Sequence, residues 1–178
     1  EFRRVLFRSK AIGAGKTVTI AGLTLAGGDA GNYTLTQPTT TADITAKTLT
    51  VTGTTAANKV YDGTVTATPT FTASALSGVV SGDTVSLVST GGSATFATKA
   101  IGAGKTVTIA GLTLAGGDAG NYTLTQPTTT ADITAKTLTV TGTTAANKVY
   151  DGTVTATPTF TASALSGVVS GDTVSLVS

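Results

Sequence analysis

The sequence predicts an all-β protein made of tandem β-sandwich modules, and three observations support this prediction. Residues 10–89 recur without a substitution as residues 99–178, so residue 10 corresponds to residue 99 and the period is 89 residues. Apolar residues alternate with threonine in short runs that glycine-rich turns separate. No segment keeps the apolar periodicity of an amphipathic helix. Because one period is close to the ~100 residues of a sandwich domain, we expect each copy to form one antiparallel β-sandwich.

The repeat divides the chain into one complete module and two partial modules. We place the complete module at residues 47–135, the C-terminal part of a preceding module at residues 10–46, and the N-terminal part of a following module at residues 136–178. Residues 1–9 do not continue the repeat and match the translation of a common sequencing adapter. We interpret them as an artefact and exclude them from fold reasoning. The alternative is a genuine basic N-terminal tail.

Seven short strands are expected in the complete module. The alternation of apolar residues with threonine places them at residues 48–52, 64–66, 84–87, 95–97, 106–109, 112–114 and 122–125. The apolar positions change from odd to even numbers across Ala110-Gly111, which predicts a bend where the strand passes to another sheet. A second change, around Lys136, marks the module boundary. No flexible spacer stands there, so we expect short, stiff joints.

A structural turn motif is predicted at Tyr61, Asp62 and Gly63, and again at its copy, Tyr150, Asp151 and Gly152. An Asp-Gly pair between β-forming residues favours a two-residue type I′ hairpin, in which both central residues have positive φ. A role for Asp62 as a ligand or an acid is the weaker alternative.

Composition excludes several classes of function. Cysteine and histidine are absent, which removes disulfides, thiolate metal sites and imidazole base catalysis. Eight lysines balance eight aspartates outside residues 1–9, so no basic patch for nucleic acid is visible. No apolar run approaches the ~20 residues that cross a bilayer. We therefore expect no enzyme activity, no catalytic residues, no cofactor, no metal site and no membrane insertion of this segment.

Several weaker motifs leave alternatives open. Ala103-Gly104-Lys105-Thr106 imitates the end of a phosphate-binding loop, but Lys99 replaces the first glycine of that signature and a strand follows in place of a helix. Asp118 could join another loop carboxylate in a weak calcium site. An intramolecular Lys–Asn isopeptide bond is a further alternative, and Asn121-Tyr122-Thr123 matches a glycosylation sequon.

Five segments in the same order carry a family resemblance. They are KVYDGT at 59–64, GVVSGDTV at 78–85, GKTV at 104–107, AGNYTL at 119–124 and ADIT at 131–134. Together they closely resemble the YDG-domain repeats of filamentous-haemagglutinin and adhesin-type bacterial surface proteins. The resemblance covers everything after Ser9 and departs from the family only slightly, at Thr98-Lys99. It implies an Ig-like β-sandwich in a Gram-negative exoprotein on the outer surface or outside the cell, and it implies no catalytic residues.

The leading hypothesis from sequence is a structural stalk or spacer that projects a distal binding domain of a large adhesin. Its partners would be the neighbouring repeat modules of the same chain. The alternative is that each repeat binds host glycans or matrix proteins weakly and that the array gains strength by avidity.

Overall fold

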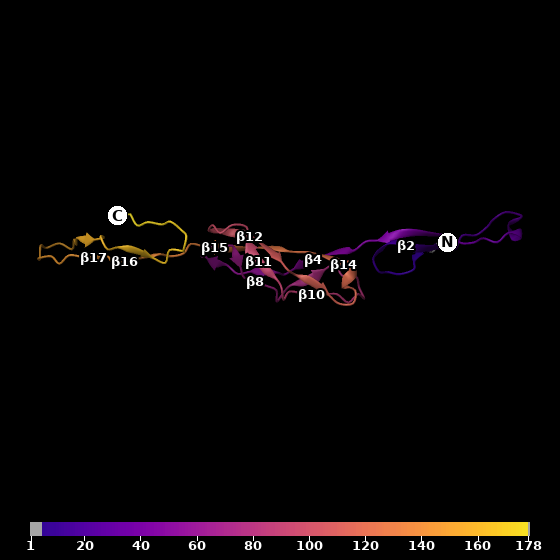
Figure 1. Ribbon diagram of the computed structural model, residues 1–178, viewed down its shortest axis with the longest axis horizontal. Coiled ribbons are helices and arrows are strands. Elements are labelled where there is room, and N and C mark those ends of the chain that lie inside the picture. The colour runs from indigo at the N-terminus through magenta and orange to yellow at the C-terminus, as the bar shows by residue number, and fades with distance from the viewer. Residues whose placement is uncertain (1–4, 178) are drawn as a thin grey trace. The chain divides into compact units, whose positions relative to one another are not determined.

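The computed structural model describes residues 5–177, and these residues form an all-β protein. They contain nineteen strands and two three-residue 3₁₀ helices, at Ala30–Asn32 (η1) and Ala119–Asn121 (η2). Figure 1 follows the chain from indigo at its N-terminus to yellow at its C-terminus. Residues 1–4 of the segment that we interpret as an artefact, and the last residue of the third module, lie outside the described residues.

The chain divides into two compact units, and the division runs through the middle copy of the repeat. One unit comprises the described residues up to Gly53 together with Ala73–Gly91 and Gly111–Pro127. The other comprises Thr54–Thr72, Gly92–Ala110 and the residues from Thr128 onward. The chain passes from one unit to the other at five places. At four of them a glycine or a proline stands at the boundary, and these residues suit abrupt changes of backbone direction.

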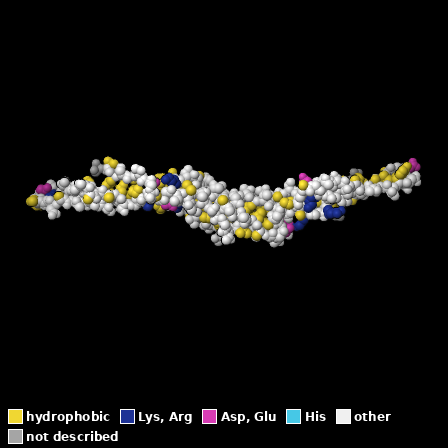
Figure 2. All heavy atoms as spheres, in the orientation of Figure 1, with side chains coloured by type: hydrophobic (Ala, Val, Ile, Leu, Met, Phe, Trp, Pro, Cys, Tyr) yellow, Lys and Arg dark blue, Asp and Glu magenta, His cyan; other side chains and the backbone are white. Residues whose placement is uncertain are grey.

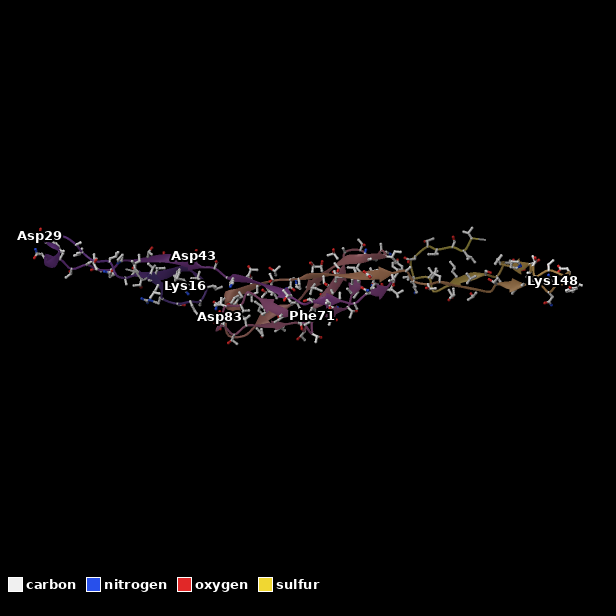
Figure 3. The ribbon with its side chains drawn as sticks, turned by 180° about the vertical axis from the view of Figure 1, so that it is seen from behind. Lys16, Asp29, Asp43, Phe71, Asp83 and Lys148 are labelled. Atoms are coloured by element: carbon white, nitrogen blue, oxygen red, sulfur yellow. The ribbon has the colours of Figure 1, made fainter. Side chains whose placement is uncertain are left out.

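The first unit begins with an antiparallel sheet in the order β1-β2-β3. Its strands are β1 (Val5–Phe7), β2 (Gly13–Ile20) and β3 (Thr39–Ile44). Val18 lies opposite Phe7 and is buried. The register of β2 against β3 shifts between Gly13 and Lys16, where Gly15 takes φ +58° and donates its N–H to the Asp43 carboxylate at 2.7 Å. Figure 3 labels Lys16 and Asp43 in this region.

Two further sheets complete the first unit. In one, β4 (Lys47–Thr52) lies between β14 (Tyr122–Thr125) and β9 (Ala75–Ser77). The other pairs β10 (Ser86–Val88) with β13 (Thr113–Ala115). Successive residues of a strand point to opposite faces, so Leu49 and Val51 are buried while Thr48, Thr50 and Thr52 stay exposed.

The second unit contains a five-stranded sheet in the order β6-β15-β12-β11-β7. Its strands are β6 (Lys59–Val60), β15 (Thr128–Thr134), β12 (Gly102–Ala110), β11 (Ser93–Phe96) and β7 (Thr66–Ala67). Figure 1 shows β11, β12 and β15 side by side. One face supplies the buried core of this unit, which consists of Ala67, Ala94, Phe96, Val107, Ile109, Ala131 and Ile133.

Three two-stranded pairs complete the second unit. They are β5 (Thr55–Ala56) with β8 (Pro69–Thr70), β16 (Thr139–Thr141) with β19 (Ala164–Ser166), and β17 (Thr144–Ala145) with β18 (Pro158–Thr159). The β16–β19 pair repeats the register of β4–β9, since Val140 faces Leu165 as Val51 faces Leu76.

The bend expected at Ala110-Gly111 is confirmed. Strand β12 belongs to the five-stranded sheet and β13 to the pair with β10, and between them Gly111 takes φ +80°. Val107 and Ile109 are buried before the bend and Leu112 after it, as the change from odd to even positions predicts. The sequence thus marks where the chain leaves one sheet for another.

The expectation of a purely antiparallel arrangement is wrong at two pairings. Strand β14 lies parallel to β4, and β15 lies parallel to β6. Both pairs join the beginning of the middle copy to its end, so a long stretch of chain is available for the crossover that a parallel pair requires. The strand expected at residues 64–66 lies instead at Thr66–Ala67. The sequence pattern predicted no strand at Thr128–Thr134, where the structure forms the long strand β15.

Candidate functional site

Charged side chains with defined partners gather where one copy of the repeat meets the next. Among residues 5–177, no charged side chain is buried and no group of three or more acidic, histidine or cysteine residues could hold a metal ion. Within the same residues, no helix has the length and apolarity needed to cross a membrane. The residues with the most specific polar contacts form two junctions, which we describe in turn.

The first junction joins Lys10, of the N-terminal copy, to two aspartates of the middle copy. The Lys10 ammonium lies 2.8 Å from Asp83 Oδ1 and 3.3 Å from Asp118 Oδ1. The other oxygen of Asp118 accepts the Thr84 N–H at 2.9 Å, which fixes the carboxylate in place. The hydrogen bond to Asp83, followed by that to Asp118, raises the pKa of Lys10 above its ordinary value.

Tyr122 supplies the second half of this junction. Its hydroxyl donates to Asp83 Oδ2 at 2.7 Å and accepts the Val80 N–H at 3.1 Å, while its ring is 8% exposed. Burial, and then the bond to Asp83, raises the pKa of Tyr122. The bonds from Lys10 and Tyr122 lower the pKa of Asp83. Both oxygens of Asp83, which Figure 3 labels, are therefore occupied.

A backbone contact joins the same two copies. The Ile12 N–H donates to Asn121 Oδ1 at 3.1 Å. Lys10, Ile12, Ile44 and Lys47 line a cavity of about 220 Å³ together with Val80, Asp83, Asn121 and Tyr122. The first junction thus combines an ion pair, a tyrosine–carboxylate bond and an apolar wall.

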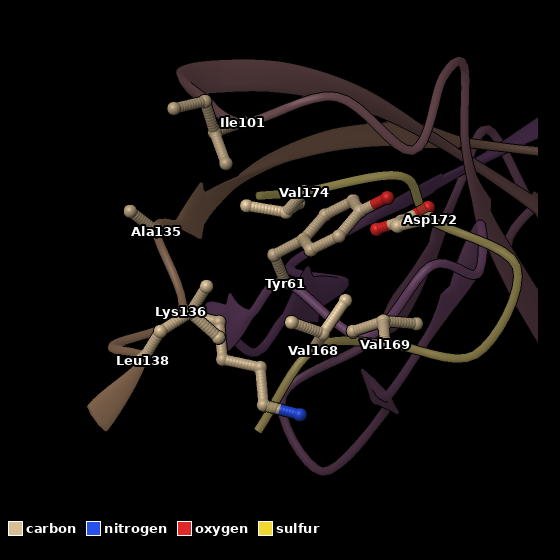
Figure 4. Close-up of a pocket in the computed structure, with 9 residues that line it drawn as sticks. All are labelled: Tyr61, Ile101, Ala135, Lys136, Leu138, Val168, Val169, Asp172 and Val174. Atoms are coloured by element: carbon tan, nitrogen blue, oxygen red, sulfur yellow. The ribbon is translucent and has the colours of Figure 1, made fainter. Parts of the chain in front are cut away.

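The second junction uses the repeat-equivalent charged pair. Lys99 is the copy of Lys10 and Asp172 the copy of Asp83, and their charged atoms lie 3.7 Å apart. Here Tyr61 supplies the phenol, and its hydrogen bond to Asp172 raises the pKa of Tyr61. Figure 4 shows the Tyr61 hydroxyl directed at the Asp172 carboxylate.

An apolar cavity of about 200 Å³ surrounds this contact. Its wall comprises Tyr61, Ile101, Ala135, Lys136, Leu138, Val168, Val169, Asp172 and Val174. The cavity is smaller than the roughly 300–1,000 Å³ of typical ligand pockets. Ile101, Lys136, Val169 and Asp172 are the copies of Ile12, Lys47, Val80 and Asp83, so the two cavities occupy the same place in the repeat.

The predicted turn motif takes a different form from the type I′ hairpin. Asp62 Oδ1 accepts the N–H and the hydroxyl of Thr64, at 2.8 and 2.9 Å, and lies 2.7 Å from the Lys59 ammonium. Gly63 has φ +80°, but no described residue other than glycine has positive φ, which excludes type I′ geometry. The aspartate side chain caps the turn itself, and the flanking strands β6 and β7 pair with β15 and β11 rather than with each other.

The copy of this turn repeats its local contacts. Asp151 Oδ1 accepts the Thr153 N–H at 2.9 Å and lies 2.8 Å from the Lys148 ammonium. Bonds from lysine and threonine lower the pKa of both aspartates, that of Asp62 to about 2. Tyr150, in contrast to Tyr61, is 92% exposed.

Other sequence motifs also have defined partners. The Gly104 N–H donates to Asp132 Oδ1 at 2.7 Å, so a carboxylate accepts from the loop that imitates a phosphate-binding loop. The loop carboxylate near Asp118, considered for a calcium site, is Asp83. The Lys10 ammonium contacts both carboxylates. The two asparagines accept backbone hydrogen bonds: Asn58 Oδ1 from the Asp132 N–H, and Asn121 Oδ1 from the Ile12 N–H.

The family follows from a comparison of the whole sequence with known domains. Residues 4–42, 45–131 and 134–178 each match the YDG domain. The chain belongs to the YDG domain family. The turn motif that carries the name lies inside the second match, at Tyr61, Asp62 and Gly63, and its copy lies inside the third. Neither the curated proteins nor the solved structures gave a match to this YDG chain.

Sequence reasoning identified the turn but not the junctions. Lys10 and Asp83 are 73 positions apart, and Ile12 and Asn121 are 109 apart. Residues so far apart in the sequence share no local pattern that could indicate the contact. The available signal is the repeat itself, because contacts between neighbouring copies must recur at every junction.

Proposed function

We propose that this YDG chain is part of the stalk or spacer of a large bacterial cell-surface or secreted adhesin. Each 89-residue copy would form an Ig-like sandwich module, with boundaries near residues 47 and 135, and successive modules would hold a distal binding domain away from the cell. The observation that carries the proposal is the recurrence of the lysine–aspartate pair at two successive junctions, Lys10 with Asp83 and Lys99 with Asp172. An outer-surface location follows from the resemblance to adhesin-type repeats.

Repeated junctions suit a spacer for a physical reason. In an array where each module contacts only its neighbours, the array resists bending only if contacts fix the orientation of the two modules at every junction. A salt bridge between exposed groups alone adds little, since its median contribution is about 0–1 kcal/mol. Here the pair is supplemented by a tyrosine bond and an apolar wall, and no glycine- or proline-rich linker separates the copies.

The stiffness of the first junction tests the proposal. The chain lacks cysteine, so two spin labels can be attached through cysteines introduced at Thr40 and Ser77, which are exposed and lie in the same compact unit. We expect a narrow distribution of distances between the labels. Asp83→Ala should broaden it, because both Lys10 and Tyr122 lose their partner.

Lys105→Ala provides the matched control. Lys105 is the copy of Lys16, lies outside the junctions and donates to Thr98 at 2.7 Å. The control should leave the distance distribution unchanged. A broad distribution in the unsubstituted chain would contradict the stalk proposal.

No specific observation favours the alternative, in which each repeat binds glycan or matrix by avidity. Of the middle copy's rings, Phe96 and Tyr122 are buried, and Tyr61 and Phe71 are partly buried. None of these rings stands free as a stacking surface. We also propose no catalytic role, because the charged and hydroxyl groups of both junctions bond to one another.

A further inference from the structure

Two parallel strand pairs tie the beginning of the middle copy to its end. Strand β4 begins at Lys47, where we divide the repeat, and lies along β14 from Tyr122 to Thr125. Strand β6 lies along β15, which ends at Thr134, opposite Val60. Figure 1 labels β4 and β14 next to each other. We call β4–β14 and β6–β15 the two parallel pairs.

The other strand pairs among residues 5–177 are antiparallel. Tension along the chain pulls the earlier strand of a pair from its N-terminal end and the later strand from its C-terminal end. In an antiparallel pair these two ends lie together, so the hydrogen bonds break one after another. In a parallel pair they lie at opposite ends, so the strands are sheared and all their hydrogen bonds are loaded at once. Within the middle copy, such tension therefore shears only the two parallel pairs.

Either parallel pair prevents extension of the middle copy while it holds. The β4–β14 pair connects residues 47–50 directly to residues 122–125, and the β6–β15 pair connects residues 59–60 to residues 133–134. Each pair forms within one compact unit. The long stretch of chain between the paired residues can be drawn out only after both pairs have failed.

We propose that the two parallel pairs form a mechanical clamp, by which a copy of the repeat resists tension applied along the chain. The clamp follows from the order and direction of the strands within one copy. Its use, to carry tension between a cell and the surface to which it adheres, rests on the stalk proposal.

The β4–β14 pair is shielded from water on one face. Leu49 of β4 is fully buried and lies opposite Leu124, and Tyr122 at the start of β14 is 8% exposed. On the exposed face, the hydroxyls of Thr48 and Thr123 lie 3.0 Å apart and form a hydrogen bond between the strands. Hydrogen bonds are stronger where water is excluded, which suits this pair to resist shear.

The β6–β15 pair is extended by one hydrogen bond at each end. Before β6, Asn58 Oδ1 accepts the Asp132 N–H at 2.7 Å, and after β6 the Tyr61 N–H donates to the Thr134 carbonyl at 2.9 Å. Ile133 of β15 is buried. Ion pairs add little to this resistance, since charged side chains are few on the face that Figure 2 shows.

Pulling the full chain in two directions tests the clamp. The chain lacks cysteine, so handles for single-molecule force measurement can be attached through Thr45→Cys and Thr137→Cys, at exposed positions on either side of the middle copy. The second direction uses Thr45→Cys with Gly120→Cys, where a Cβ has open space. This direction pulls both strands of each parallel pair from their N-terminal ends, so both pairs peel instead of shearing.

The rupture force should depend on the direction of pulling. Because sheared hydrogen bonds break together and peeled ones break singly, the force between residues 45 and 137 should be at least about twofold higher than the force between residues 45 and 120. A smaller difference at the same loading rate would overturn the clamp.

This result is distinct from the test of the stalk proposal. A narrow distance distribution between the spin labels at Thr40 and Ser77, with equal rupture forces in the two directions, would refute the clamp alone. A broad distribution with unequal rupture forces would refute the stalk alone.

A matched pair of variants tests the contribution of the β6–β15 pair. Asn58→Ala removes the acceptor of the Asp132 N–H and should lower the rupture force between residues 45 and 137. Ser86→Ala removes a bond from the Ser86 hydroxyl to the Ala115 carbonyl, at 3.3 Å, across the antiparallel β10–β13 pair, and should leave this force unchanged. Circular dichroism should be the same in both variants. An equal effect of the two substitutions on the force would overturn the role of β6–β15 in the clamp.

Discussion

Asp62 has three bonding partners around one carboxylate oxygen. The Thr64 N–H, the Thr64 hydroxyl and the Lys59 ammonium all lie within 2.9 Å of Oδ1. Bonds of this kind favour the ionised form, and they lower the pKa of Asp62 from 3.8 to about 2. The turn that carries the family motif is therefore stabilised by a charged side chain rather than by a type I′ backbone.

This arrangement predicts an acid dependence of stability. A depressed pKa in the folded state gives stabilisation that is complete above the ordinary value of 3.8 and is lost as the pH falls toward about 2. Thermal unfolding followed between pH 5 and pH 2 should therefore show a smaller loss of stability in Asp62→Asn than in the unsubstituted chain. Equal pH dependence in the two proteins would contradict the prediction. Asp83 and Asp151, whose pKa values are also lowered, should keep some dependence in both.

Tyr122 predicts a dependence of the opposite sign. Its raised pKa means that its contribution is complete below the ordinary value of 10 and is lost as the pH rises through the folded-state value. The same sign holds for Lys10, whose pKa is also raised. Tyr122→Phe should therefore unfold with a weaker dependence on alkaline pH than the unsubstituted chain. The measurement is the unfolding midpoint in urea at a series of alkaline pH values, and an equal pH dependence in the two proteins would argue against a raised pKa of Tyr122.

At the level of elements, glycines set the points where strands stop or change sheet. Gly116 follows β13 with φ +113°, and a Cβ there would overlap the carbonyl oxygen of Thr84. The next residue, Gly117, has open space around the position of a Cβ. Neighbouring glycines in one turn thus differ in whether the fold requires them.

This pair gives an element-scale prediction with its own control. Gly116→Ala should lower the free energy of unfolding by about 1–3 kcal/mol, because positive φ and the overlap with Thr84 both oppose a side chain. Gly117→Ala should change it by less than about 0.5 kcal/mol. Denaturant unfolding measures both. If the free energy of unfolding fell as little in Gly116→Ala as in Gly117→Ala, the turn after β13 would tolerate a different backbone conformation.

Sequence patterns predicted the elements better than their partners. The alternation in residues 106–109 and 112–114 indicated both strands and the bend at Gly111, because burial of every second side chain is a local property. The parallel pairing of β4 with β14 could not be read in this way, since it joins residues 75 positions apart, Lys47 with Tyr122. The Asp62 turn was located correctly but given the wrong geometry, because the side chain competes with the backbone for the Thr64 N–H.

At the level of the whole molecule, the stalk proposal depends on one premise. It treats an 89-residue copy as a self-contained body whose two halves bury each other's apolar residues. The middle copy supports this premise, because Leu49, Val51 and Tyr122 are buried there, whereas Val140 and Tyr33, the copies of Val51 and Tyr122 in the partial modules, are 48% and 71% exposed.

The most direct test of this premise is denaturant unfolding of residues 47–135 alone. A self-contained module should unfold in one cooperative transition, with circular dichroism and tyrosine fluorescence giving the same midpoint and a urea m-value of about 1 kcal/mol/M. A fragment that is unfolded in buffer, or that loses its signals at different urea concentrations, would contradict the account.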